Sequence, residues 1–184
     1  MGKIVITGTG RCGTSFLMHL FTELGLNTGY TVDECESHLE RSGCDGGIEH
    51  SIGSRDFKKS DIIKNPLWMY EPELLDFDIK HIIVPVRNLE DVAKSRANMG
   101  AGMYGGFWRG ATNGEEQMKI DAKAFYQFIN FTVKQNLKVI FLDFPRIVKD
   151  LEYLYDKIGN KIGTCTSSWD VSFAKIANID KVHV

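Results

Sequence analysis

A loop near the start of the chain has the residue types of an anion-binding site. This glycine loop, residues 8–13, follows an apolar run, contains Gly10 and Gly13, and leads directly to Thr14 and Ser15. Where such a loop joins a buried strand to a helix, backbone N–H groups and the positive end of the helix dipole point at one spot. The pattern therefore predicts a phosphate or sulfate site, with the two hydroxyl groups as further donors.

Two cationic side chains and a serine follow other predicted strands. Lys64 ends a short apolar run, Arg87 follows the longer run 81–86, and Ser95 lies in a helix that Asn88 is expected to cap. Ser95 comes about two helical turns after Asn88, so both lie on one helix face. Because ligands bind at the carboxyl ends of parallel strands, we expect Lys64, Arg87 and the glycine loop to meet at one sheet edge.

The elements that position these residues alternate along the chain. Apolar patterns predict strands over 4–6, 61–66, 81–86 and 137–142, and helices over 14–24, 88–99, 115–135 and 146–158, with a last helix after 159. This alternation predicts an α/β fold, a three-layer α/β/α arrangement with a mostly parallel sheet, like that of P-loop nucleoside-triphosphate hydrolases. The chain has 184 residues, so we expect one domain over 1–184.

Two stretches are predicted as loops. Residues 27–56 are polar, contain glycines and show weak periodicity, and 100–113 begins with the most glycine-rich stretch of the chain and carries aromatic side chains. Long loops in compact domains are commonly functional. We therefore expect these two loops to bind a substrate or to cover the ligand.

The composition argues against several classes of protein. A formal net charge of −2 argues against broad nucleic-acid binding. The four cysteines show no paired spacing, which favours a reduced, cytoplasmic protein. Cys35, His38, Cys44 and His50 match no zinc-ligand pattern, so no metal is expected. No apolar run approaches the roughly 18 residues of a membrane-spanning helix, so we expect no membrane span.

The spacing Gly8-x4-Gly13-Thr14-Ser15 resembles the P-loop signature of nucleoside triphosphatases, with one departure. Thr14 stands where those proteins have a lysine, which helps a magnesium ion to neutralise a triphosphate. A sulfuryl group carries fewer charges and needs no metal. Thr14 therefore favours a sulfate-bearing ligand.

Together, segments 8–16 and 84–95 resemble the two nucleotide-binding motifs of sulfotransferases, which transfer a sulfuryl group from 3′-phosphoadenosine 5′-phosphosulfate (PAPS) to a hydroxyl or an amine. In that family the first motif binds the 5′-phosphosulfate. The second motif pairs an arginine at a strand end with a serine eight residues later, and it binds the 3′-phosphate. Arg87 and Ser95 have this spacing, and the resemblance covers residues 3–160.

The resemblance implies a role for each matching residue. Arg11 would neutralise the 5′-phosphate and the leaving bridge oxygen, and Lys64 would reach the sulfuryl oxygens. Cys12 is interpreted as a small loop residue, although a thiol at a helix N-terminus can have a lowered pKa. The implied contacts to PAPS, and to its product 3′-phosphoadenosine 5′-phosphate (PAP), are Gly10, Arg11, Cys12, Gly13, Thr14, Ser15, Arg87 and Ser95.

In-line sulfuryl transfer to a hydroxyl also needs a base that takes the acceptor proton. Sulfotransferases with an arginine in the first motif commonly use a carboxylate soon after the helix that follows the loop. Asp33 and Glu34 fit this spacing best, with Glu34 slightly ahead, and the alternatives are Glu36, His38 and Glu40. The sequence leaves the choice open.

Two other functions remain open. The run 139–143 ends in Asp143 and fits the strand that holds magnesium in P-loop kinases and NTPases. A protein of this fold can also bind a nucleotide without turnover. The acceptor is predicted as a small molecule, a glycan or a lipid, and the sequence predicts neither the adenine site nor the oligomeric state.

Overall fold

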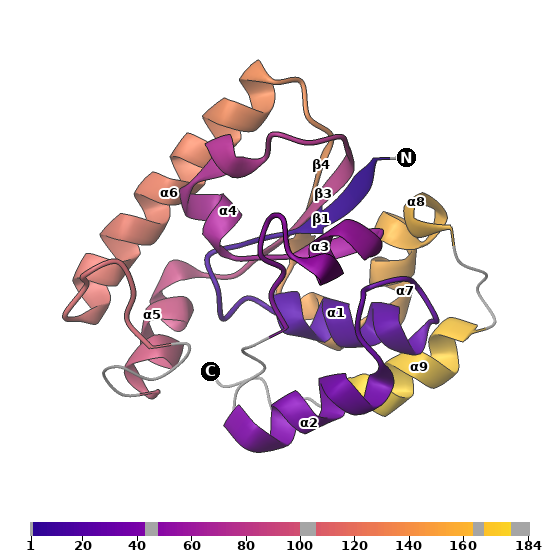
Figure 1. Ribbon diagram of the computed structural model, residues 1–184. Helices are drawn as coiled ribbons and strands as arrows, with labels where there is room; N and C mark the ends of the chain where they lie inside the picture. Colours follow the sequence, from indigo (N-terminus) through magenta and orange to yellow (C-terminus); the bar gives the residue numbers. More distant parts are fainter. Residues whose placement is uncertain (1, 43–47, 100–105, 164–167, 178–184) are drawn as a thin grey trace.

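The computed structural model describes residues 2–42, 48–99, 106–163 and 168–177. In these residues, four parallel strands form one sheet in the order β2-β1-β3-β4 (Figure 1). Each strand overlaps an apolar run that predicts a strand in the sequence. The strands are β1 (Lys3–Ile6), β2 (Ile62–Lys64), β3 (Ile79–Val86) and β4 (Val139–Asp143).

Helices connect the strands and account for much of the remaining chain. None of the described helices has the length and hydrophobicity needed to cross a membrane. The α-helices are α1 (Thr14–Glu23), α2 (Val32–Ser42), α3 (Arg55–Lys59), α4 (Leu67–Tyr70), α5 (Leu89–Ala97), α6 (Gly114–Lys134), α7 (Leu151–Leu154), α8 (Asn160–Ile162) and α9 (Trp169–Ile176). Shorter turns are the 3-10 helices η1 (Pro72–Leu74) and η2 (Arg146–Val148) and the π-helical turn η3 (Tyr155–Gly159).

The sheet separates two hydrophobic cores, which confirms the predicted three-layer α/β arrangement (Figure 1). Ile4 and Ile6 of β1 pack with residues of α1, α7 and α9, whereas Val5 packs with residues of α4 and α6. Parallel strands that are covered on both faces need apolar side chains on both faces. This requirement explains why the strand sequences are continuous apolar runs.

Local capping signals set the starts of the helices that follow the candidate site residues. The Asn88 side chain accepts a hydrogen bond from Glu90 N at 2.8 Å and starts α5. Asn113 caps α6 in the same way, through Glu116 N at 3.0 Å. Both helices begin within one residue of the predicted positions, because each cap satisfies a backbone N–H that the first helical turn leaves unpaired.

The polar stretch 27–56 is not the continuous loop that the sequence predicts, because it contains α2 and the start of α3. Thr31 Oγ1 accepts a hydrogen bond from Glu34 N at 3.3 Å, and Glu34 Oε2 accepts one from Thr31 N at 2.7 Å. This reciprocal capping box starts α2. Of the second predicted loop, residues 100–105 lie outside the described residues, and 106–113 form an irregular segment before α6.

The predicted helix over 146–158 is broken into η2, α7 and η3. Asp150 causes one break, since its side chain accepts a hydrogen bond from Tyr153 N at 2.9 Å and starts a new helix. The apolar residues of these turns still face the core, as the helical spacing indicates. Ile147, Leu154 and Ile158 are all buried in the cluster that contains α1.

Replacing Phe21 by alanine should lower the free energy of unfolding by about 3–5 kcal/mol, because a fully buried ring in the α1 core leaves a cavity. Chemical denaturation measures this change. Val133→Ala is the control: Val133 is 73% exposed on α6, so a loss under about 0.5 kcal/mol is expected. Equal losses in the two variants would contradict the core described above.

Candidate anion-binding site

The glycine loop joins β1 to α1 through left-handed backbone conformations. Gly10, Arg11 and Gly13 have φ angles of 80°, 54° and 88°. A Cβ atom at Gly13 would lie 2.6 Å from the Phe144 ring, so both conformation and space require glycine there. The loop follows the carboxyl end of β1, and it therefore places the N-terminus of α1 at the edge of the sheet where anions bind.

Two arginines and a serine from distant segments meet at this loop. The sequence predicts Arg87 at this edge of the sheet, but it does not predict the contact between Arg11 and Ser95. Arg11 Nε donates a hydrogen bond to Ser95 Oγ at 3.0 Å, and Arg87 Nη1 donates to the carbonyl oxygen of Arg11 at 2.9 Å. The Arg87 guanidinium also lies over the Phe144 ring, 5.2 Å from its centroid. Burial lowers the pKa of Arg87, and the neighbouring Arg11 charge acts in the same direction. Such a pair of cations favours an anionic ligand.

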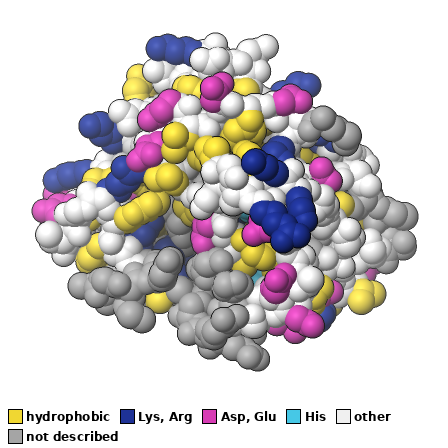
Figure 2. Space-filling model, in the orientation of Figure 1, with side chains coloured by type: hydrophobic (Ala, Val, Ile, Leu, Met, Phe, Trp, Pro, Cys, Tyr) yellow, Lys and Arg dark blue, Asp and Glu magenta, His cyan; other side chains and the backbone are white. Residues whose placement is uncertain are grey.

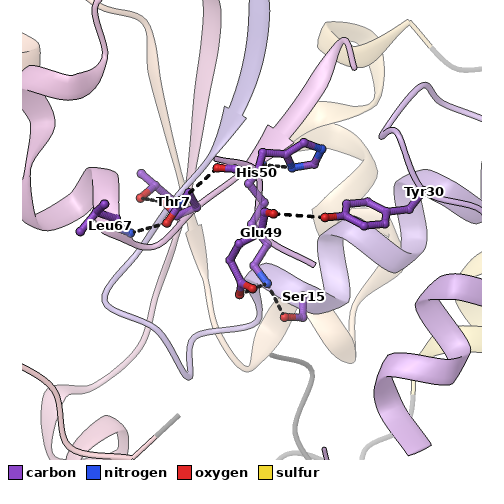
Figure 3. A network of polar contacts seen from close by, with 8 residues as sticks. Thr7, Ser15, Tyr30, Glu49, His50 and Leu67 are labelled. Carbon is purple, nitrogen blue, oxygen red and sulfur yellow. Dashed lines mark hydrogen bonds and ion pairs between the residues drawn. The ribbon is translucent and has the colours of Figure 1, made fainter. Parts of the chain in front are cut away.

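A buried lysine connects β2 to the start of α1 (Figure 3). Lys64, the last residue of β2, is 1% exposed, and its Nζ donates to Ser15 Oγ at 2.7 Å and to Glu49 Oε1 at 3.1 Å. A buried ammonium group is costly unless it is paired and hydrogen-bonded. The Glu49 carboxylate and the Ser15 hydroxyl meet this requirement, and they fix the ammonium at the first turn of α1.

Hydrogen bonds to the backbone of residues 49 and 50 hold Glu49 in place beside β2 (Figure 3). Tyr30 Oη donates to the Glu49 carbonyl oxygen at 3.2 Å, and His50 N donates to the Lys64 carbonyl oxygen at 2.7 Å. Asn65 Nδ2 donates to the His50 carbonyl oxygen at 3.0 Å. The Glu49 side chain remains 29% exposed, so a ligand can reach the carboxylate although the segment is fixed.

His50 is a buried structural residue beneath this ion pair. Lys64 N donates to His50 Nδ1 at 3.1 Å, so the opposite nitrogen, Nε2, carries the hydrogen and donates to the Thr28 carbonyl oxygen at 2.9 Å. Burial lowers the pKa of His50, which keeps the ring uncharged at neutral pH. The neutral ring thus ties the segment of Glu49 to the end of β2 and to the turn after α1.

The predicted bases do not form this ion pair. Asp33 and Glu34 lie exposed in the first turn of α2, where Glu34 caps the helix. Glu36 is exposed and pairs with a lysine of α9 at 3.3 Å. The side chains of His38 and Glu40 lie outside those that the structure describes. The carboxylate partner of Lys64 is instead Glu49, which lies near the end of the stretch 27–56 and is not among the predicted bases.

Sequence reasoning missed Glu49 because it searched at a fixed spacing after the glycine loop. Glu49 reaches the site later, where the chain returns toward β2. The available signal was an acidic residue between Ile48 and His50, inside a polar stretch that leads to a strand ending in Lys64.

Cys12 supplies no reactive thiol to the site. Its side chain is fully buried, and burial raises its pKa to about 11. Its sulfur packs so closely on the loop that a Cβ atom at Gly8 would lie 2.7 Å away. This burial agrees with the interpretation as a small loop residue, and its effect on the pKa outweighs the lowering that a helix N-terminus can produce. Cys12 would contact a ligand through its backbone.

Asp143, on which the magnesium alternative depends, is exposed at the end of β4. Strand β3 lies between β4 and β1, which leads into the glycine loop. In the part of the chain that the structure describes, no three His, Cys, Asp or Glu side chains gather as metal ligands would.

A solved structure has a similar fold. The chain is similar to the sulfotransferase domain from the olefin synthase of Synechococcus PCC 7002, with a TM-score of 0.56 and 11% sequence identity. The fold is sulfotransferase-like. The similarity covers 99% of this chain and 79% of that chain. No family model matches the sequence, and no curated protein matches it.

Cys12 should resist alkylation by iodoacetamide in the native protein at pH 8, because a raised pKa leaves the thiol protonated and burial excludes the reagent. After denaturation it should react fully. Mass spectrometry of the peptide that contains Cys12 measures both states. Rapid labelling of the native thiol would contradict the buried position.

Proposed function

We propose that this protein transfers a sulfuryl group from PAPS to a hydroxyl or an amine. The observation that carries the proposal is the placement of cationic side chains on both sides of β1, around one glycine loop. Arg87 and Ser95 lie on the side of β3 and α5, and Lys64 lies on the side of β2. PAPS has two separate anionic groups, a 3′-phosphate and a 5′-phosphosulfate, and the two sides offer a place for each.

On the β3 side, Arg87 and Ser95 would bind the 3′-phosphate. A planar guanidinium can donate two parallel hydrogen bonds to a phosphate, which a lysine cannot. Arg11 is already in contact with this half, since its Nε donates to Ser95 and its carbonyl oxygen accepts from Arg87. In the proposed complex, Arg11 neutralises the 5′-phosphate and the backbone N–H groups of residues 12–15 complete its binding.

On the β2 side, Lys64 and Ser15 would bind the sulfuryl oxygens. Glu49 is the base in this proposal, in preference to Asp33 and Glu34, because its partly exposed carboxylate already touches the Lys64 ammonium. The acceptor oxygen forms a bond to sulfur, the bond from sulfur to the bridge oxygen breaks, and the acceptor proton passes to Glu49. As Glu49 becomes neutral, the Lys64 charge becomes available to stabilise the leaving PAP oxygen.

The proposed reaction needs no metal ion, since Arg11, Lys64 and the N-terminus of α1 supply the positive charge. The acceptor would approach the exposed part of the Glu49 side chain. Its class remains a small molecule, a glycan or a lipid that carries a hydroxyl or an amine.

PAP should raise the melting temperature, because a ligand that binds only the native state stabilises it by mass action. At 100 times its Kd the gain is about 2.7 kcal/mol, or about 5–10 °C for a chain of this size. Arg87→Ala should remove most of the shift, and Arg55→Ala, on exposed α3, should keep it. A shift with ATP and magnesium but none with PAP would favour a kinase or NTPase instead.

Glu49→Gln should lower the rate of sulfuryl transfer about 10²–10⁴-fold, because the amide cannot take a proton. Its affinity for PAP should stay within about twofold of the wild type. The assay follows labelled PAPS against a panel of phenols, alcohols, sugars and amines, with Asp33→Asn and Glu34→Gln as matched controls.

Full activity in Glu49→Gln, together with loss of activity in Asp33→Asn or Glu34→Gln, would indicate that the base lies in α2 and is not Glu49. Tight PAP binding without transfer to any acceptor would instead favour a nucleotide-binding protein that lacks turnover.

A further inference from the structure

A second buried arginine, Arg96, follows Ser95 in the sequence and also contacts the glycine loop. Arg96 is 3% exposed, although α5 is a short helix near the surface. Its Nη2 donates to the carbonyl oxygen of Thr9, and its Nη1 donates to the carbonyl oxygen of Gly106 at 2.7 Å. One guanidinium therefore joins the glycine loop to the segment 106–110, which precedes α6.

A buried polar cluster supports the same two segments. Tyr70 Oη lies 2.6 Å from Asp121 Oδ1 and 3.0 Å from the Thr9 carbonyl oxygen. Gln117 Nε2 donates to Asp121 Oδ1 at 2.7 Å, and Gln117 Oε1 accepts from Trp108 N at 2.7 Å. Gln117 and Asp121 are both almost completely buried. The cluster therefore connects Thr9 at one end to Trp108 at the other, parallel to the Arg96 connection.

Further contacts fix the segment 106–110 on α4. The rings of Trp108 and Tyr70 meet edge to face, with centroids 4.7 Å apart. The Arg109 guanidinium lies 5.6 Å from each ring centroid and pairs with Glu71. Arg109 has a φ of 59°, a left-handed conformation that persists only where surrounding contacts impose it. The segment is thus built against the same helices that hold Thr9.

The glycine loop needs such support because Arg11 is also left-handed, a backbone conformation that is unfavourable for a residue with a Cβ atom. Arg96 packs against the loop directly, since a Cβ atom at Gly10 would lie 2.8 Å from its Nη2. Ser95, the preceding residue, holds the Arg11 side chain. Two consecutive residues of α5 therefore fix the loop. Ser95 accepts a hydrogen bond from the Arg11 side chain, and the Arg96 side chain donates to the loop backbone at Thr9.

We infer that Arg96 is a positioning residue that couples the glycine loop to the segment 106–110. Order in either segment then favours order in the other, because both depend on the same guanidinium and the same buried cluster. The coupling itself follows from contacts in the protein alone. Its use, that PAP in the anion site stabilises the segment 106–110, rests on the proposed function.

Hydrogen exchange of the full chain tests the coupling without any ligand. Arg96→Lys keeps the charge but loses the planar fork that reaches two carbonyl oxygens. We expect exchange to rise about tenfold or more in both peptides, 7–13 and 106–111, and to stay unchanged in α9. Tyr70→Phe, which removes one hydroxyl, should give a smaller rise in the same two peptides. Lys94→Met, at an exposed position of α5, is the matched control and should change neither.

A rise in one peptide without the other, or in neither, would overturn the coupling. So would an equal rise throughout the protein at matched temperature, because that would indicate general destabilisation. The Tyr70→Phe variant keeps this test decisive if Arg96→Lys fails to fold.

Acrylamide quenching of tryptophan fluorescence provides a second test, because general destabilisation would not produce a change in quenching that depends on PAP. Trp68 and Trp169 are each 1% exposed, so quenching reports mainly on Trp108, and Trp108→Phe supplies the background. Saturating PAP should reduce quenching at least twofold in the wild type and leave it unchanged in Arg96→Lys. Equal protection in both proteins would overturn the coupling. If PAP does not bind the wild type, the proposed function fails and hydrogen exchange alone decides the coupling.

Discussion

The arrangement of the site depends on the burial of one ammonium group. Lys64 is almost completely excluded from solvent, and a charge in that position costs several kcal/mol unless nearby groups compensate for it. Compensation requires that Ser15 at the start of α1 and Glu49 in the returning chain both reach the end of β2. Tyr30 and Asn65 take part because they hold the backbone of residues 49–50, and Thr28 takes part because its carbonyl oxygen accepts from the His50 ring. The lysine thereby links three segments that are far apart in sequence.

The second constraint is repulsion between Arg11 and Arg87, which share a hydrogen bond through a backbone carbonyl. The chain as a whole is slightly acidic, and Figure 2 shows acidic and basic side chains interspersed over one face of the molecule, so the positive charge at this edge of the sheet is local. It results from cationic side chains and from the N-terminus of a helix. Because Arg87 and Lys64 are buried, an anion would relieve the cost of holding these charges close together.

Apolar runs allowed the strands to be predicted, and asparagine caps allowed the starts of α5 and α6 to be predicted, because both are local rules. The geometry of parallel sheets predicted that the glycine loop, Lys64 and Arg87 would lie at one edge, but it did not predict the contact between Arg11 and Ser95. Glu49 could not be predicted in this way. Its position depends on hydrogen bonds from Tyr30, His50 and Asn65, none of which a spacing pattern encodes. Arg96 shows the same limit, since an arginine on a short polar helix is normally exposed, and here the side chain is buried where it contacts the glycine loop and Gly106.

The strand order also sets a length scale for whatever binds. Neighbouring strands lie about 4.8 Å apart, so backbone positions at the ends of β2 and β3, on either side of β1, are separated by at least about 10 Å. Lysine and arginine side chains are long, so Lys64 and Arg87 can bring their charged groups from these two positions toward the glycine loop between them. The strand order therefore sets the span over which the protein can present cationic groups at this edge of the sheet.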